Sequence, residues 1–251
     1  MQGIRPVRLV ANGMRKIGLP PLRRPLTKPK EDPTEELVKR GTKVYVYSVI
    51  AHVRTILCAL VQLAEAENIP ASHIISRHVF EWAANACYMS RNLKDHFQRK
   101  EWGQAWNALT VASTGNLWAR KHGNKYEPRA AQLPVVMPDP LRIGKAISDY
   151  EEYQSQRHGT KEAKDNYGLL SEHSHPNSAC LQLYHKYSPN GIDLQFVDPY
   201  PVSFLPIVNW CLIDLLMFIE DLLELSHDIT VRAGVVSLLK ELTKLAPATR
   251  G

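Results

Sequence analysis

The sequence predicts an all-α bundle of about seven helices with one small β-hairpin near 181–197. Three observations support this prediction. Apolar residues recur at spacings of three and four through most of the chain, which is the period of a helix with one buried face. The pairs Asp32-Pro33 and Asp139-Pro140 are typical of helix starts. Period-two alternation is confined to a short stretch around an Asn-Gly turn, as expected for a hairpin.

The length and composition indicate one helical domain, 32–251, preceded by an extension, 1–31. The chain has 251 residues, of which 44% are hydrophobic, and can bury one large core. Its formal net charge is +6. Residues 1–30 contain eight basic residues and no acid, which is a net charge of +8. Residues 31–251 contain 23 basic and 25 acidic residues, which is a net charge of −2. Because the extension also contains five prolines, we predict that it is disordered.

This basic extension is either an arm for RNA or another acidic partner, or a solvated leader. No uninterrupted apolar segment comes after its first charges, so we expect no signal peptide. The cysteines are far apart, form no C-x-x-C pair and lie in apolar contexts: Cys58, Cys87, Cys180 and Cys211. Such residues are typical of reduced, buried thiols, and we therefore expect a cytoplasmic protein. A homodimer is compatible with the sequence, and nothing in it calls for a cofactor.

The first predicted helix begins at Asp32-Pro33-Thr34-Glu35 and ends near Asn68. We interpret Asp32 as the N-cap, Pro33 as the first helical position and Glu35 as part of a capping box. One face of this helix is apolar at helical spacing and should be buried. That face comprises Val46, Ile50, Val53, Leu57, Leu60 and Ala64.

The second predicted helix, 72–99, has two faces of opposite character. Its apolar face comprises Ile75, Val79, Trp82, Ala86, Met89, Leu93 and Phe97. At about 100° per residue, six polar side chains fall together on the other side. This polar stripe comprises Arg77, Glu81, Asn85, Tyr88, Asn92 and His96. It is either a solvated face or one wall of a cavity.

The remaining predicted elements are helices over 100–121, 140–157 and 160–174, a loop over 124–139, the hairpin, and helices over 204–225 and 230–245. The stretch 204–225 is apolar almost all round, but Asn209, Asp214, Glu220 and Asp221 interrupt it. A charged residue at mid-bilayer costs about 2.5 to 3.5 kcal/mol on insertion scales. We therefore predict a buried core helix and no membrane span.

The densest group of reactive side chains is Tyr167-Gly-Leu-Leu-Ser-Glu-His-Ser-His-Pro-Asn177. Pro176 disfavours a helical backbone at His175, so the helix should end near Ser174. Tyr167, Ser171 and His175 are spaced by fours and would share one helical face. The histidines either cap the last carbonyls or belong, with Glu172 and Asn177, to a catalytic or ligand-orienting cluster.

A metal site in this segment is disfavoured. Glu172, His173 and His175 are suitable ligand types, but no H-x-x-x-H or H-E-x-x-H spacing places two imidazoles on one helical face. Structural zinc normally takes four ligands, and no cysteine lies nearby. We therefore predict no metal centre here.

A second candidate site lies in Arg91-Asn92-Leu-Lys-Asp-His96, which resembles the Arg-x(4–6)-His motif of HEPN ribonucleases. The resemblance implies that His96 activates an RNA 2′-hydroxyl and that Arg91 stabilises the phosphate without metal. On a straight helix the two side chains would lie about 140° apart, and use on a solvated face is the alternative.

Two further motifs, Ser76-Arg77-His-Val-Phe-Glu81 and the Tyr167–Asn177 segment, resemble those of a group of uncharacterised bacterial all-helical proteins. That group carries an Arg-x-x-x-Glu helix and a later Tyr-x-x-Leu-Ser-Glu-x-x-His-Pro segment, and the resemblance covers about 72–225. It implies the fold and no established activity. It also implies that Arg77 and Glu81 turn inward to meet Glu172 and His175; otherwise they form an exposed ion pair of little energetic weight.

The sequence therefore leaves two functions open. One is a HEPN-like, metal-independent ribonuclease of toxin or phage-defence type, with His96 or His175 as general base and Arg77 or Arg91 holding phosphate. The other is a non-catalytic binding or scaffold module, in which the Arg-Glu-His residues form a structural network that holds helices in register.

Overall fold

The computed structural model describes residues 4–21, 32–114, 119–122, 125–128, 143–159, 161–172, 185–189, 191–194 and 204–245. Within these ranges the chain is an all-α bundle, as predicted, with eight helices. They are α1 (Arg5–Lys16), α2 (Glu35–Glu65), α3 (Ile69–Arg99), α4 (Trp102–Thr114), α5 (Ile143–His158), α6 (Ala163–Glu172), α8 (Phe204–Leu225) and α9 (Ile229–Leu245). Four short strands accompany them: β1 (Ala119–His122), β2 (Lys125–Pro128), β3 (His185–Ser188) and β4 (Gly191–Leu194).

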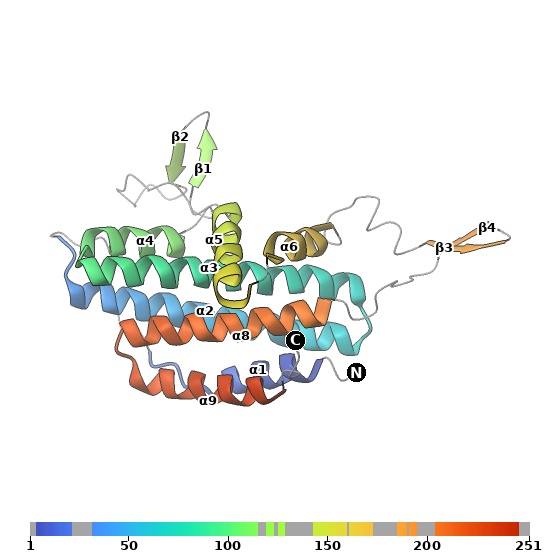
Figure 1. Cartoon of the computed structure of the whole chain (residues 1–251), viewed down its shortest axis with the longest axis horizontal. Helices are drawn as coiled ribbons and strands as arrows, with labels where there is room; N and C mark the ends of the chain where they lie inside the picture. Colours follow the sequence, from blue (N-terminus) through green and yellow to red (C-terminus); the bar gives the residue numbers. More distant parts are fainter. Residues whose placement is uncertain are drawn as a thin grey trace.

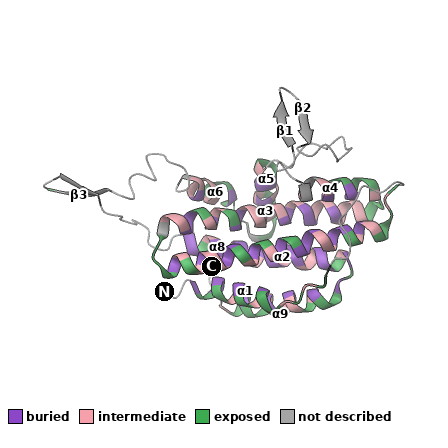
Figure 2. Cartoon of the chain, turned by 180° about the vertical axis from the view of Figure 1, so that it is seen from behind, coloured by how far each residue is buried: buried purple, intermediate pink, exposed green. Residues whose placement is uncertain are grey.

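Helix α3 is the centre of the bundle, packing against α2, α4, α5, α6 and α8. Helices α1 and α9 lie along one side of the molecule, and α4, α5 and α6 lie along the other (Figure 1). Figure 2 shows that buried residues lie on the inward-facing sides of the helices. The core is therefore continuous from the α1–α9 layer to the α5–α6 layer.

The predicted buried face of α2 is confirmed, because all six of its residues are at most 2% exposed. The predicted N-cap is wrong. Thr34 is the N-cap, and its hydroxyl accepts a hydrogen bond of 3.3 Å from the Leu37 amide. Pro33 therefore precedes the helix, and Glu35 and Glu36 occupy the first turn, where the helix dipole favours acids. By length and composition α2 contains a stretch that qualifies as a membrane span, and half of that stretch is buried in the fold.

Helix α3 begins at Ile69, three residues before the predicted start. Asn68 is its N-cap and accepts a hydrogen bond from the Ala71 amide at 3.2 Å. Pro70 lies in the first turn, where backbone N–H groups have no acceptor within the helix, so proline's lack of an N–H costs no helical hydrogen bond. Of the predicted apolar face, Val79, Ala86, Met89 and Leu93 are fully buried, and the other members are partly buried against the core.

The helix predicted over 100–121 is too long at both ends. Helix α4 begins only at Trp102, because Lys100 adopts a left-handed conformation that ends α3, and its described residues extend to Thr114. Residues 119–122 are strand β1, which pairs antiparallel with β2. Strand β2 falls inside the predicted loop 124–139, and residues 129–139 lie outside the described residues.

The later helices lie close to their predicted positions. Helix α8 has the predicted bounds, α9 begins one residue early, and the described parts of α5 and α6 fall within one residue of the predicted ranges. Strands β3 and β4 pair antiparallel from His185↔Leu194 to Ser188↔Gly191. Residues 181–184, 190 and 195–197 of the predicted hairpin lie outside the described residues.

The prediction that residues 1–31 are disordered is wrong for α1, a helix of 12 residues. Pro6 lies in its first turn, where proline is tolerated. Val7, Val10 and Met14 are at most 1% exposed and pack on the core, whose elements α2, α8 and α9 contact α1. Burial of this apolar face outweighs the low helix propensity of Gly13. Residues 22–31 lie outside the described residues.

Three helix-to-helix turns share one geometry. At each, a residue other than glycine has a positive φ: Glu67 (55°), Lys100 (58°) and His227 (55°). The next amide in each turn then bonds back to a carbonyl five residues earlier, as in Asn68 to Leu63 at 2.9 Å. This is the Schellman arrangement, in which glycine is the usual left-handed residue. These turns reverse the chain within a few residues and bring α2 beside α3, and α8 beside α9.

The Glu67→Gly variant is expected to be more stable than the wild type by about 1 kcal/mol. Glycine adopts φ of 55° without the strain that a side chain causes, and the change also removes an acid from a helix C-terminus. Urea unfolding followed by circular dichroism measures the difference. Glu67→Ala is the control, since it removes the charge but keeps the strain. A glycine variant no more stable than the alanine variant would contradict this account.

Gly13 allows α1 to approach α9 closely. A Cβ at position 13 would overlap the Leu238 side chain and lie 3.2 Å from its Cγ. We expect Gly13→Ala to lose about 1 kcal/mol, because crowding outweighs the gain in helix propensity. Gly168→Ala in α6, where no atom lies within 4 Å of the added Cβ, should gain about 0.5 to 1 kcal/mol. Thermal unfolding of both variants tests this, and equal shifts would contradict it.

Candidate functional site

The polar stripe of α3 is half-buried along its whole length, because all six of its residues are of intermediate exposure. Helices α5 and α6 lie over it. Tyr167 of α6 reaches Arg77, and the Lys145 ammonium of α5 lies 5.1 Å from the centre of the Tyr88 ring. Asn92 turns back to its own helix and donates to the Tyr88 carbonyl at 2.7 Å. The stripe is therefore an interface between helices and not an open solvated face.

Arg77, Glu81 and Tyr167 form a three-membered polar cluster at the α3–α6 contact. The Arg77 Nε donates to Glu81 Oε1 at 3.0 Å, and its Nη2 donates to the Tyr167 hydroxyl at 2.9 Å. That hydroxyl donates in turn to Glu81 Oε1 at 3.2 Å. The guanidinium also lies 5.2 Å from the centre of the Tyr167 ring. Arg77 and Glu81 therefore both contact α6 through Tyr167, a partner that they share.

The electrostatics of the cluster stabilise the charged form of Arg77. Partial burial acts to lower its pKa, but the Tyr167 hydrogen bond and the Glu81 charge raise the pKa above its ordinary value. The Arg77 and Glu81 side chains are 22% and 23% exposed, so solvent screens their attraction only in part. The pair is thus more than an exposed surface contact.

Two histidines for which the sequence pattern indicated no role lie beside this cluster. The exposed His78 imidazole is 3.5 Å from Glu81 Oε2. His52 of α2 has its ring 5.1 Å from that of Trp82. Partial desolvation lowers the pKa of His52, and the nearby His78 lowers it further. The i,i+3 spacing of His78 and Glu81 could have indicated from the sequence that these two side chains are neighbours on α3.

The rest of the predicted Tyr167–Asn177 cluster is described only in part. Ser171 is half-buried one helical turn after Tyr167, and Glu172 is the last residue of α6. His175 and Asn177 lie outside the described residues. The meeting of Arg77 and Glu81 with Glu172 and His175 therefore stays a prediction.

Arg91 and His96 point to different elements. The Arg91 guanidinium donates to the Asp149 carbonyl at 3.1 Å and to Glu152 at 3.3 Å, both on α5. The His96 Nδ1 lies 2.9 Å from Glu101, in the turn between α3 and α4. The described contacts therefore do not bring the two side chains to one reacting centre, in agreement with their angular separation on the helix.

A buried carboxylate that the sequence pattern did not assign to a site connects α8 to α5. Asp214 is 3% exposed and accepts a hydrogen bond of 2.6 Å from the Tyr150 hydroxyl. Burial raises the pKa of Tyr150 well above its ordinary value, and the neighbouring Cys211 and Asp214 act in the same direction. The position of Asp214 within the apolar run 204–225 could have indicated this contact from the sequence, because a buried acid needs a hydrogen-bonding partner.

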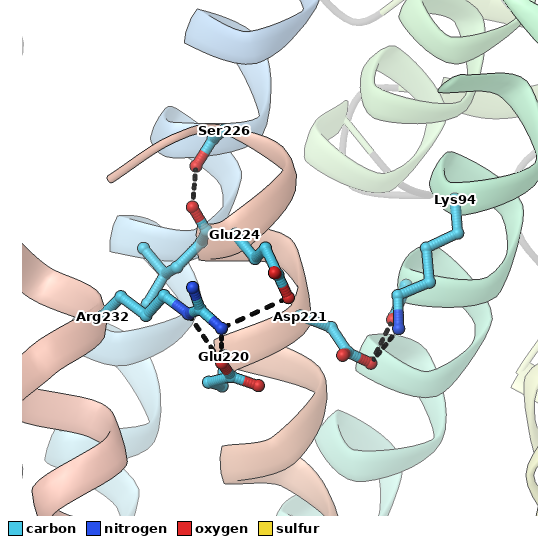
Figure 3. Close-up of polar contacts among 8 residues, drawn as sticks. Lys94, Glu220, Asp221, Glu224, Ser226 and Arg232 are labelled. Carbon is cyan, nitrogen blue, oxygen red and sulfur yellow. Dashed lines mark hydrogen bonds and ion pairs between the residues drawn. The ribbon is translucent and has the colours of Figure 1, made fainter. Parts of the chain in front are cut away.

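An acidic group on α8, Glu220, Asp221 and Glu224, has its ligand atoms within 4.8 Å of one another (Figure 3). Two cations of the protein already pair with its three carboxylates. Arg232 of α9 contacts Glu220 at 2.5 Å and Glu224 at 3.3 Å. Lys94 of α3 lies 2.7 Å from Asp221. These ion pairs connect α8 to α3 and α9, and a metal ion would have to displace them.

The fold and the described contacts define a helical bundle with a polar cluster at the α3–α6 interface. Comparisons with family models, characterised proteins and solved structures find no match to this chain. Both resemblances seen in the sequence therefore remain predictions.

The Tyr167→Phe variant should be less stable than the wild type by about 1 to 2 kcal/mol, because it leaves Arg77 and Glu81 without the shared hydroxyl. A double-mutant cycle with Arg77→Met should give a coupling energy of about 1 kcal/mol. Urea unfolding measures both values. Tyr88→Phe is the matched control, since it removes a half-buried tyrosine hydroxyl from the polar stripe of α3, where Tyr88 faces α5 instead of α6. Equal losses for the two phenylalanine variants would contradict a special role for Tyr167.

Proposed function

We propose that the chain is a non-catalytic helical binding or scaffold module, in which the Arg77–Glu81–Tyr167 cluster holds α6 on α3. The observation that carries this proposal is the mutual hydrogen bonding of the three side chains. The guanidinium donates to both the carboxylate and the phenol, and the phenol donates to the same carboxylate. A cation that is neutralised inside the fold contributes to the orientation of helices more than to the capture of a substrate phosphate.

The contacts of Arg91 and His96 also support a structural role. Each side chain is held by a carboxylate or carbonyl of its own, and these partners belong to different elements. A general base and an anion-binding cation must approach the same reacting group within hydrogen-bond distance. The separate partners therefore favour the scaffold over a HEPN-like pair.

In this proposal the cluster positions the part of the chain that comes directly after α6. Tyr167 is five residues before the end of that helix at Glu172, and the next residues are His173-Ser-His-Pro-Asn177. A binding surface is most specific when it starts from a rigid element. The polar side chains of this segment are then the groups that recognise the partner of the module.

The ribonuclease remains a second candidate because of His78. This exposed imidazole lies 3.5 Å from Glu81, so a proton acceptor, a guanidinium and a phenol meet near one part of the surface. Such a set is capable of proton transfer beside an anion. In this alternative the general base is His78, His96 or His175.

Incubation of the purified protein with total RNA in EDTA separates the two candidates. The scaffold predicts no cleavage above a buffer control, and no difference among wild type, His78→Ala, His96→Ala and His175→Ala. Gel electrophoresis of the RNA is the measurement, with circular dichroism to verify that each variant is folded. Cleavage by the wild type that one histidine variant abolishes would overturn the scaffold and identify the base.

A further inference from the structure

Helix α1 carries a row of basic side chains on its outer face. Arg5, Arg8, Arg15 and Lys16 are all exposed, and we call these four residues the basic ridge. At about 100° per residue they fall within an arc of about 100° on the helix. With a rise of about 1.5 Å per residue, the ridge is about 16 Å long.

The opposite face of α1 is fixed to the bundle. Val7, Val10 and Met14 are at most 1% exposed, and Gly13 lies against Leu238 of α9. The ridge is therefore presented by a docked helix and not by a free tail. This docking also separates α1 from helices that bind membranes, because those helices insert the apolar face that α1 has already buried.

The charge of the ridge is largely uncompensated. Arg8 forms an ion pair with Glu65 of α2. Among the described residues, Arg5, Arg15 and Lys16 have no ion-pair partner. The chain then adds four more basic residues before its first acid, Glu31: Arg23, Arg24, Lys28 and Lys30. Positive charge is thus concentrated at one end of a chain whose remaining 221 residues carry a net −2.

We propose that the basic ridge binds the sugar-phosphate backbone of a nucleic acid. The exposed side chains of α1 are four cations and Asn12, which suit phosphate oxygens. Protein partners are normally anchored by Trp, Tyr and Arg side chains that become fully desolvated in pockets, and the ridge offers arginines but no aromatic side chain. Contacts of this kind read no base sequence, so the binding is independent of sequence and weakens with salt. This inference does not depend on the role of the Arg77–Glu81–Tyr167 cluster.

Fluorescence anisotropy of the full chain with short labelled single-stranded RNA, single-stranded DNA and duplex DNA tests the proposal. The Arg5→Gln/Arg8→Gln/Arg15→Gln/Lys16→Gln variant should bind at least about tenfold more weakly near physiological salt. The slope of log K against log salt should also become shallower by about 0.7 to 0.9 for each phosphate that the variant no longer neutralises. The three probes show whether single strands or a duplex is preferred.

A control variant removes the same charge from other helices and the segment before α6. Its positions are exposed and lie outside α1: Arg40→Gln, Arg99→Gln, Lys161→Gln and Lys164→Gln. It should bind within about twofold of the wild type, since it keeps all four cations of the ridge. Thermal unfolding verifies that both variants keep the fold.

Three results would overturn the proposal. They are no binding of any probe by the wild type, equal weakening by the two quadruple variants, and a salt slope that the ridge variant leaves unchanged. Binding to vesicles that contain phosphatidylserine, without binding to nucleic acid, would also overturn it and indicate a membrane surface instead.

Discussion

The enclosure of α3 governs the arrangement of the other helices. One side of α3 is apolar and packs on α2 and α8, whereas α5 and α6 cover its polar stripe. Covered polar groups must find partners inside the protein, because an unpaired group costs its full desolvation free energy. Tyr167 of α6 joins Arg77, and the Asp149 carbonyl of α5 receives Arg91. On its other side α5 connects to α8 through Tyr150 and the buried Asp214. These pairings decide where α5 and α6 lie.

The same contacts bear on function. Side chains that neutralise one another in the α3–α6 contact contribute to structure, and this favours the proposed scaffold over the ribonuclease. On the opposite layer, on the outer face of α1, Arg5, Arg15 and Lys16 have no ion-pair partner among the described residues. A module with these features would hold one partner by polar recognition after α6 and a polyanion by electrostatic attraction along α1. Helices α1 and α6 lie on opposite sides of the bundle (Figure 1), so the basic ridge and the Arg77–Glu81–Tyr167 cluster can be mutated independently.

Local pattern was enough to predict the helical class, the buried face of α2 and the bounds of α8. The period of the apolar residues and the length of an apolar run can be read directly from the sequence. In these elements the tertiary structure buries the residues that the local pattern marks as apolar. Caps were less predictable: Asp32 and Thr34 both suit an N-cap by residue type, and in the structure it is Thr34 that accepts the Leu37 amide. The left-handed turns at Glu67, Lys100 and His227 had no glycine to indicate them.

Helix packing, and not local sequence pattern, decided which helix faces contact one another. The prolines, glycines and charges of residues 1–31 favour disorder, yet α1 forms because α2, α8 and α9 offer it an apolar surface. The sequence placed Arg77 and Glu81 one turn apart and Tyr167 in the middle of a later helix, but local spacing contained no information on their distance in space. Contacts between residues some ninety positions apart depend on the packing of whole helices, and local spacing does not encode that packing.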